Sequence, residues 1–207
     1  MLNLEAIWRT EVSERPFSFF VVENILSAAD LAAVKNDFPS IDRPGLFPIQ
    51  DVTYGPAFKR LVSEIRSRDF TYVMGKKFRI NLTQKPLLMT VRGQSRLSDG
   101  RIHTDSKSRI ISCAIYLNDE WHNTAGKLLI LRNRSDYTRA LAEIPPDGGT
   151  LVAIRRSNRS WHGYLPYKGE RRCLAFNWMW SKKTREVERA RNRLSAHLKN
   201  VSGQMHF

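Results

Sequence analysis

Two histidines and one aspartate are the residues of this chain whose types and spacing point most directly to chemistry. His103 and Asp105 stand two positions apart in GRIHTD, and His162 follows in RSWHGYLPY. Residues i and i+2 of an extended strand face the same side, so the first pair could bind one metal ion together. His162 would supply a third ligand. Taken alone, the His-x-Asp pair is also consistent with a charged turn before a strand.

Two imidazoles and one carboxylate form the facial donor set of non-haem Fe(II) oxygenases, which leaves open positions for a co-substrate and dioxygen. Zinc would favour a tetrahedral set completed by thiolates or a third imidazole. Neither Cys113 nor Cys173 lies near these histidines in the sequence. We therefore expect iron. His122 is a weaker candidate ligand, because no acidic residue stands at a useful spacing from it.

Arg171, nine residues after His162, could bind the carboxylate of a co-substrate. A guanidinium group can hold a carboxylate through two charge-assisted hydrogen bonds. Strand alternation favours Arg171 over Arg172, because the side of the strand that carries Arg171 also carries small residues, whereas the other side is bulky. The small residues are Cys173, Ala175 and Asn177, and the bulky ones are Leu174, Phe176 and Trp178. Arg172 stays the alternative.

Three segments in one order, GRIHTD, the strand ending AIYLND, and WHGYLP followed by GERRCLAFNW, resemble the Fe(II)/2-oxoglutarate-dependent dioxygenases. The likeness is to the prolyl 4-hydroxylase-like branch in particular. It covers about residues 86–180, and the earlier segment FFVVENILSAADL is similar to the same branch. The resemblance implies that His103, Asp105 and His162 bind Fe(II), and that Arg171 and Tyr116 bind 2-oxoglutarate.

The same resemblance implies an oxidoreductase: a hydroxylase that uses O2 and 2-oxoglutarate and releases succinate and CO2. One departure from the family is that only Gly126 precedes the strand AGKLLIL, where relatives often have two glycines. The substrate stays unidentified, because loops and N-terminal elements select it in such enzymes.

The segments that would position these residues change character at Pro86. After it come LLMTVRG, RIISCAIYLN, KLLILR, TLVAI and RRCLAFNWMW, which are typical of antiparallel strands. Before it we expect helices over 28–38, with Ser27 as N-cap, and from Pro56 over 56–68. Another helix is expected over 135–144. The fold class is α+β and mainly β, and the resemblance implies a double-stranded β-helix, or jelly roll, braced by the N-terminal helices.

One domain over residues 1–207 is expected, because this length suits a single core. It would consist of a helical part (1–85), a jelly-roll core (86–180) and a C-terminal basic helix and tail (181–207). We expect that helix over 181–199 to be mainly solvated, with a narrow apolar seam of Val187, Leu194 and Leu198. Docking to nucleic acid or a membrane surface is the alternative for the helix.

The net charge of +14, from 34 basic and 20 acidic residues, favours anionic partners. Basic residues around Arg92–Arg96 and Arg155–Arg159 could rim the metal site and select an anionic substrate, although solvated arginines explain them equally well. Nucleic acid is a possible partner that is not favoured, because Asn177 stands where the oxidative nucleic-acid demethylases carry a second arginine. A non-catalytic jelly roll that binds acidic glycan or nucleic acid is the alternative function.

The chain lacks the run of about 20 apolar residues that a membrane-spanning helix needs, and its first residues do not form a secretory signal. Two cysteines in apolar segments suggest buried thiols in a reducing compartment, so we expect a cytoplasmic protein. No nucleophile elbow or Walker loop indicates a hydrolase or a nucleotide-binding enzyme. The sequence does not predict an oligomeric state.

Overall fold

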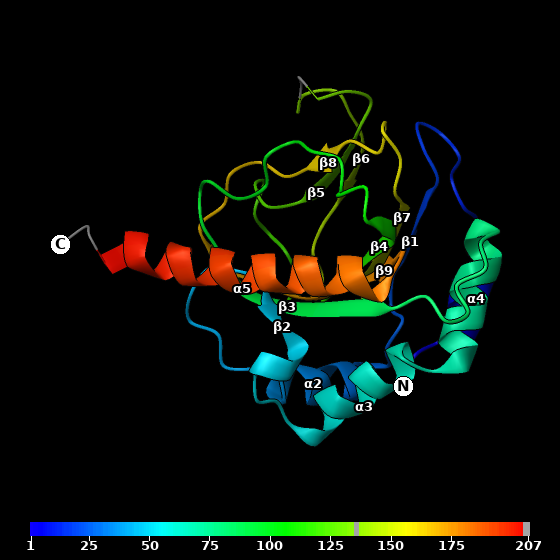
Figure 1. Cartoon of the computed structure of the whole chain (residues 1–207), viewed down its shortest axis with the longest axis horizontal. Helices are drawn as coiled ribbons and strands as arrows, with labels where there is room; N and C mark the ends of the chain where they lie inside the picture. The colour runs from blue at the N-terminus through cyan, green and yellow to red at the C-terminus, as the bar shows by residue number, and fades with distance from the viewer. Residues whose placement is uncertain (135–136, 205–207) are drawn as a thin grey trace.

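Two antiparallel sheets dominate the computed structural model, which describes residues 1–134 and 137–204, with side chains up to residue 196 (Figure 1). The larger sheet has the order β1-β7-β4-β9-β3-β2, and the smaller has the order β6-β5-β8. The strands are β1 (Phe19–Val22), β2 (Phe47–Pro48), β3 (Leu87–Ser95), β4 (Arg109–Tyr116), β5 (Leu128–Leu131), β6 (Ala140–Ile144), β7 (Leu151–Arg155), β8 (His162–Gly163) and β9 (Gly169–Met179). The fold is thus mixed and mainly antiparallel β.

The helices are concentrated at the N-terminus. They are α1 (Leu4–Arg9), α2 (Ala28–Asn36), the short 3-10 helix η1 (Ile49–Asp51), α3 (Pro56–Ile65), α4 (Arg68–Phe78) and the C-terminal α5 (Lys182–Gln204). The hydroxyl of Ser27 accepts the backbone N–H of Asp30 at the start of α2, and Pro56 occupies the first position of α3. Both predicted helix starts are confirmed. Figure 1 shows α2 and α3 on one side of the larger sheet and the smaller sheet on the other.

The larger sheet separates two groups of buried side chains. On one face, Phe176 and Trp178 of β9 pack against Phe70 of α4, with ring centroids 5.7 and 6.0 Å from that of Phe70. On the other face, Cys173 of β9 packs with Tyr116 and with apolar residues of β5. The predicted alternation along β9 is therefore confirmed, and the smaller side chains line the space between the two sheets.

All five predicted strands are present as β3, β4, β5, β7 and β9. The helix expected over 135–144 is wrong for residues 140–144, which form β6; residues 135–136 lie outside the described part of the chain. β6 pairs with β5, placing Ile144 opposite Leu128. Backbone pairing along the edge of the smaller sheet satisfies its hydrogen bonds and overrides the local helix preference.

Helix α5 packs against β2, β3 and β9, but not through the predicted apolar seam. Val187 is 62% exposed and Leu194 is 60% exposed, so that expectation is wrong; the side chain of Leu198 lies outside the described residues. The buried side chains of the helix include Ala196 and, unexpectedly, Glu188. An acidic side chain takes the place of an apolar contact because the partly buried Arg109 lies opposite it, as described below.

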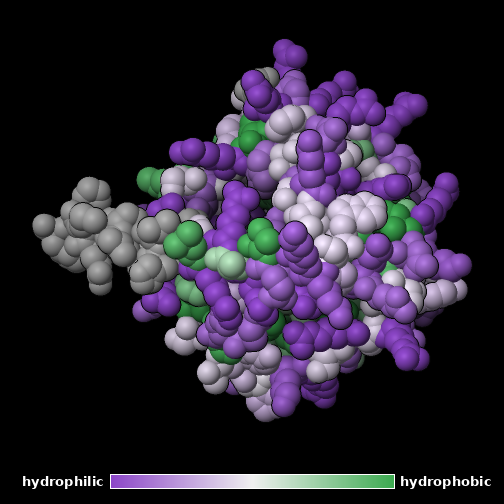
Figure 2. Space-filling view, in the orientation of Figure 1, coloured by the Kyte–Doolittle hydropathy of each residue, from purple (hydrophilic) through white to green (hydrophobic). Residues whose placement is uncertain are grey.

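The surface in Figure 2 is mainly hydrophilic, with hydrophobic residues scattered over it. In the part of the chain that the structure describes, no helix has both the length and the apolarity to cross a bilayer. Cys113 and Cys173 are buried free thiols, as predicted.

Candidate metal centre

His103 and His162 are held side by side by backbone pairing. The N–H of each residue donates to the carbonyl of the other, at 2.9 and 3.0 Å, in an isolated antiparallel bridge. Their ring centroids lie 4.5 Å apart. The bridge extends the short pairing of β8 with β5, so the sheet itself brings together two residues that are distant in the sequence.

A hydrogen bond at Nδ1 fixes the orientation of each imidazole. Nδ1 lies 2.8 Å from the Arg101 carbonyl in His103, and 2.9 Å from the Ser160 carbonyl in His162. A carbonyl only accepts, so each Nδ1 carries the proton and donates, which leaves the Nε2 lone pair of a neutral ring free for a metal.

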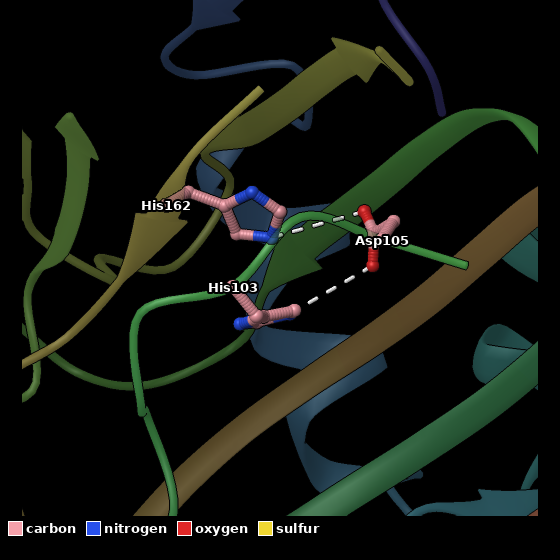
Figure 3. A group of neighbouring side chains, drawn as sticks. All are labelled: His103, Asp105 and His162. Atoms are coloured by element: carbon pink, nitrogen blue, oxygen red, sulfur yellow. Dashed lines mark ion pairs between the residues drawn. The ribbon is translucent and has the colours of Figure 1, made fainter. Parts of the chain in front are cut away.

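Asp105 completes the group in the loop before β4. The Nε2 atoms of His103 and His162 lie 3.8 and 3.7 Å from its carboxylate oxygens (Figure 3). One ligand atom from each of the three residues lies within 4.8 Å of the others. The side chains of Asp105 and His162 are 8% and 10% exposed, whereas that of His103 is 52% exposed. The centre is therefore embedded in the protein but open on one side, as a catalytic metal requires.

The charges of this group suit a cation. Burial alone would raise the pKa of Asp105, but Arg109, His162 and His103 together lower it to about 2. Burial lowers the pKa of His162, against the opposing effect of Asp105. At neutral pH the carboxylate is thus ionised and this imidazole is neutral, which are the states that bind metals.

Arg109 binds the Asp105 carboxylate, and Glu188 in turn binds Arg109. Arg109 Nη1 donates to Asp105 Oδ1 at 2.8 Å and to Asn177 Oδ1 at 3.2 Å, and its Nη2 donates to Glu188 Oε2 at 3.0 Å. Glu188 also accepts from the Ser108 hydroxyl at 2.9 Å. A continuous set of charge-assisted hydrogen bonds therefore joins α5 to the candidate ligand.

Sequence reasoning missed both residues of this support. Arg109 follows Asp105 by four positions, a spacing of opposite charges that could have drawn attention to it. Glu188 lies 79 residues beyond Arg109, inside a basic helix, and no local pattern marks it. Only the packing of α5 against the sheet reveals its role.

Arg171 is buried between the two sheets. Its guanidinium carbon lies 5.1 Å from the ring centroid of Tyr116 and 4.2 Å from that of Tyr164. Nε donates to the Gly126 carbonyl at 2.9 Å, and Nη2 donates to the Tyr116 hydroxyl at 3.4 Å. It makes no ion pair with any residue that the structure describes. A buried cation without a carboxylate partner is costly, so the site fits a bound anion.

The neighbouring arginine has a different environment. Arg172 Nη2 donates to Glu170 at 2.8 Å, and its guanidinium carbon lies 5.5 Å from the Phe38 ring centroid near α2. It therefore points away from the space where Arg171 lies. Tyr164, which packs closest to Arg171, was not singled out from the sequence, although it stands two residues after His162.

Other sequence candidates lie outside the centre. Arg92 and Arg96 pair with Asp99, at 3.0 and 3.7 Å, so part of the positive charge in this predicted basic group is compensated. Exposed His122 lies 3.9 Å from Glu120, so the expectation that it lacks a nearby acidic residue is wrong, but it is not part of the ligand group. Burial raises the pKa of both cysteine thiols, which keeps them neutral at physiological pH.

These residues fit a ferrous ion together with an acidic co-substrate. The donor set consists of two imidazole nitrogens and one ionised carboxylate, with space on the exposed side of His103 for further ligands. Buried Arg171, which has no carboxylate partner in the described chain, is consistent with an anion bound between the sheets.

Comparisons with known proteins agree with this chemistry. Residues 94–180 match the sequence model of the 2OG-Fe(II) oxygenase superfamily. None of the curated proteins matches the chain.

Three solved structures illustrate the similarity in fold. A prolyl-4-hydroxylase from Pseudomonas putida is 16% identical, with a TM-score of 0.56 over 85% of this chain and 96% of that one. The viral collagen prolyl hydroxylase vCPH from Paramecium Bursaria Chlorella virus-1, in complex with 2OG, is 14% identical, with a TM-score of 0.54 over 77% and 93%. HygX from Streptomyces hygroscopicus, with nickel and 2-oxoglutarate bound, is 12% identical, with a TM-score of 0.52 over 78% and 81%.

Proposed function

The chain belongs, through residues 94–180, to the 2OG-Fe(II) oxygenase superfamily, and from this premise we propose that it hydroxylates a substrate at a ferrous centre held by His103, Asp105 and His162. It is a 2-oxoglutarate-dependent Fe(II) dioxygenase whose cofactors are Fe(II), 2-oxoglutarate and O2. The observation that carries the proposed ligand assignment is the convergence of two free Nε2 atoms and one carboxylate.

Arg171 and Tyr116 are proposed to bind the distal carboxylate of 2-oxoglutarate. Arg171 is buried, and its guanidinium lacks a carboxylate partner in the described chain. The Gly126 carbonyl and the rings of Tyr116 and Tyr164 hold the guanidinium in place, so little side-chain freedom is lost on binding. The Tyr116 hydroxyl lies beside the guanidinium and can donate a second hydrogen bond to the same carboxylate.

When bound, the ferrous ion and 2-oxoglutarate supply the oxidation: one oxygen atom of O2 enters a C–H bond of the substrate, and the other enters succinate as CO2 is released. The protein contributes orientation and exclusion of water. Arg109 orients the Asp105 carboxylate, and the backbone bridge between His103 and His162 fixes the two rings. This pre-organisation lowers the cost of assembling the centre.

The finer architecture is part of the same proposal. We propose that the two sheets form a double-stranded β-helix and that residues 1–207 fold as one domain. Apolar residues of both sheets share one cluster, which supports this reading. A cytoplasmic location is proposed from the two buried free cysteines.

Anaerobic addition of Fe(II) and 2-oxoglutarate tests the proposed ligands. The wild-type protein should develop a weak visible charge-transfer band, and the His103→Ala variant should not. The matched control is His122→Ala, which removes an exposed histidine outside the ligand group and should keep the band. An equally strong band in His103→Ala would contradict the assignment, and no band in any form would favour a non-catalytic binding module.

Succinate release extends the test to turnover. Wild-type protein supplied with Fe(II), O2 and 2-oxoglutarate should release succinate slowly even without substrate, whereas Asp105→Ala should not. Equal release by both proteins would argue against a role for Asp105.

A further inference from the structure

A cavity of about 310 Å³ beside the candidate metal centre is lined almost entirely by basic and apolar side chains. It lies where the ends of β7 and β9 meet the start of β4 and the end of α4. Its basic lining residues are Arg79, Lys107, Arg109, Arg155 and Arg156, and Trp180 also lines it. No acidic residue in the described part of the chain lines it.

A second cavity of about 350 Å³ lies next to the first, since Arg155 and Arg156 line both. It adds a further cation, Arg159, and one acidic residue, Glu14, whose carboxylate accepts a hydrogen bond from the Ser18 hydroxyl at 2.6 Å. We refer to the two cavities together as the basic groove. Along its whole length, one carboxylate faces six basic side chains.

Most of these positive charges have no acidic partner among the described residues. Arg109 pairs with Asp105 and Glu188, but the other basic residues of the groove make no ion pair with any described residue. They are Arg79, Lys107, Arg155, Arg156 and Arg159. Like charges that line one cavity repel each other, and a bound anion relieves that repulsion. Guanidinium groups match the oxygens of a phosphate especially well, since each can donate two parallel hydrogen bonds.

The groove also touches the candidate centre directly. Arg109 donates to the Asp105 carboxylate at 2.8 Å, and Arg156 Nε donates to the Asp105 backbone carbonyl at 3.1 Å. Two residues that line the groove therefore contact Asp105, which would bind iron. Arg159 belongs to the loop that leads into His162, so the groove runs from one ligand-bearing segment to another.

One end of the groove offers an aromatic surface. Trp180 is 55% exposed, and Lys85 Nζ lies 5.1 Å from its ring centroid. An exposed aromatic ring beside cations can stack on a planar group while the cations bind a phosphate.

We propose that the basic groove binds a phosphate ester carried by the substrate and thereby sets the substrate class of the neighbouring oxidation site. The statement that the groove sets the substrate class rests on the proposed function, but binding of a phosphate ester to the groove can be measured without iron or turnover. The phosphate could belong to a free nucleotide or to the backbone of a single-stranded nucleic acid, and the two sources share the chemistry that the groove recognises.

Fluorescence polarisation with two probes distinguishes the sources: fluorescein-labelled AMP and a short fluorescein-labelled single-stranded oligothymidylate. Wild-type protein should bind at least one of them. AMP binding as tight as oligothymidylate binding identifies a small phosphorylated substrate, whereas much tighter oligothymidylate binding identifies nucleic acid. Failure of wild-type protein to bind either probe would overturn the proposal.

Matched charge reversals test the location. Lys107→Glu/Arg155→Glu changes two exposed side chains of the groove and spares the residues that contact Asp105. Lys59→Glu/Arg60→Glu makes the same change of net charge on the exposed side of α3. The groove variant should bind the probe at least about tenfold more weakly, a loss of about 1.4 kcal/mol, while the control stays near wild type.

Two results would contradict the inference. A separate measurement distinguishes a failure of this inference from a failure of the proposed function. Equal weakening of both variants would show that only net charge matters, and equal competition by polyglutamate would show that phosphate is not preferred. The anaerobic Fe(II) and 2-oxoglutarate band is recorded for the same groove variant. Retention of the band with loss of probe binding would support the groove, whereas absence of the band from every protein would count against the oxygenase centre alone.

Discussion

Arg171 and Arg172 are adjacent in the sequence but have different surroundings, so we expect their substitution to have different effects on 2-oxoglutarate binding. Arg171→Gln should raise the KM for 2-oxoglutarate by roughly 10- to 100-fold, because a hydrogen bond to a charged group contributes about 1.5–3 kcal/mol. Uncoupled succinate release measured against 2-oxoglutarate concentration gives this value. The reason is that Arg171 is buried without a carboxylate partner in the described chain, whereas Arg172 already pairs with Glu170.

Arg172→Gln is the matched control and should leave that KM within about twofold of wild type. A large rise in Arg172→Gln with none in Arg171→Gln would reverse the assignment. Thermal unfolding of both variants separates lost binding from lost structure, since Arg171 packs against two tyrosine rings.

Gly126 is a residue whose conformation supports the same site. Its φ of +81° is unfavourable for other residues, and a Cβ added there would lie 2.7 Å from Trp121 Cζ2. Gly126→Ala should therefore destabilise the fold by about 1–3 kcal/mol. It should also raise the KM for 2-oxoglutarate, because the Gly126 carbonyl holds Arg171 Nε. A thermal melt and the succinate assay check the two effects, and an unchanged KM would show that the carbonyl is not needed for positioning.

The sequence could predict the residues whose chemistry is marked by local spacing, and it missed those that act through packing. His103, Asp105 and His162 stood out because ligand types recur at a recognisable spacing, and the structure brings them together. Glu188 carries no such signal, because its importance depends on where α5 lies against the sheet. A salt bridge across 79 residues has no local pattern.

Helix α5 is joined to the candidate metal centre by the ion pair between Glu188 and Arg109. Glu188→Gln should lower the stability at neutral pH by about 1–3 kcal/mol, because Arg109 loses a charged partner in a buried setting. Glu186→Gln is the control: the same change in the same helix affects a half-exposed residue that pairs with Arg185 and Arg189. Chemical unfolding of the three proteins gives the comparison. Equal losses in both variants would show that Glu188 contributes no more than a surface charge.

The pH dependence of that difference has a definite sign. Burial would raise the pKa of Glu188, but Arg109 and hydrogen bonds from Ser106 and Ser108 lower it below its ordinary value of 4.5. A carboxyl with a depressed folded-state pKa stabilises the fold above its unfolded-state pKa and loses that effect as the pH falls through the folded-state value. The gap between wild type and Glu188→Gln should therefore shrink below about pH 4.5. A gap that widens in acid would contradict this order of pKa values.

Strands in the middle of the larger sheet were easier to predict than β6, which lies at an edge of the smaller sheet. β4, β7 and β9 have partners on both sides, so their sequences are rich in β-branched and aromatic residues. β6 lies at an edge and alternates buried and exposed positions over a segment that also suits a helix. Its strand form depends on pairing with β5, a tertiary effect that composition does not encode.

For the molecule as a whole, the main hydrophobic core is separate from the candidate metal ligands. That core lies between the larger sheet and the helices, whereas His162 belongs to the smaller sheet and His103 is bridged to it. Removal of metal by EDTA should therefore leave a folded protein, unlike a small zinc domain whose fold depends on its ion. Near-ultraviolet circular dichroism should keep its native signal, and collapse of that signal on chelation would show that the ion is structural.

Binding should still stabilise this folded apoprotein, because a ligand that binds only the native state adds RT ln(1 + [L]/Kd) to the free energy of unfolding. At about 100 times Kd the gain is about 2.7 kcal/mol. For a chain of this size that corresponds to a rise in Tm of roughly 5–10 °C. Mn(II) with 2-oxoglutarate is an air-stable probe, and Asp105→Ala should show little of the shift. If that variant is stabilised as much as wild type, the ion binds elsewhere, and convergence of the three side chains does not define the metal site.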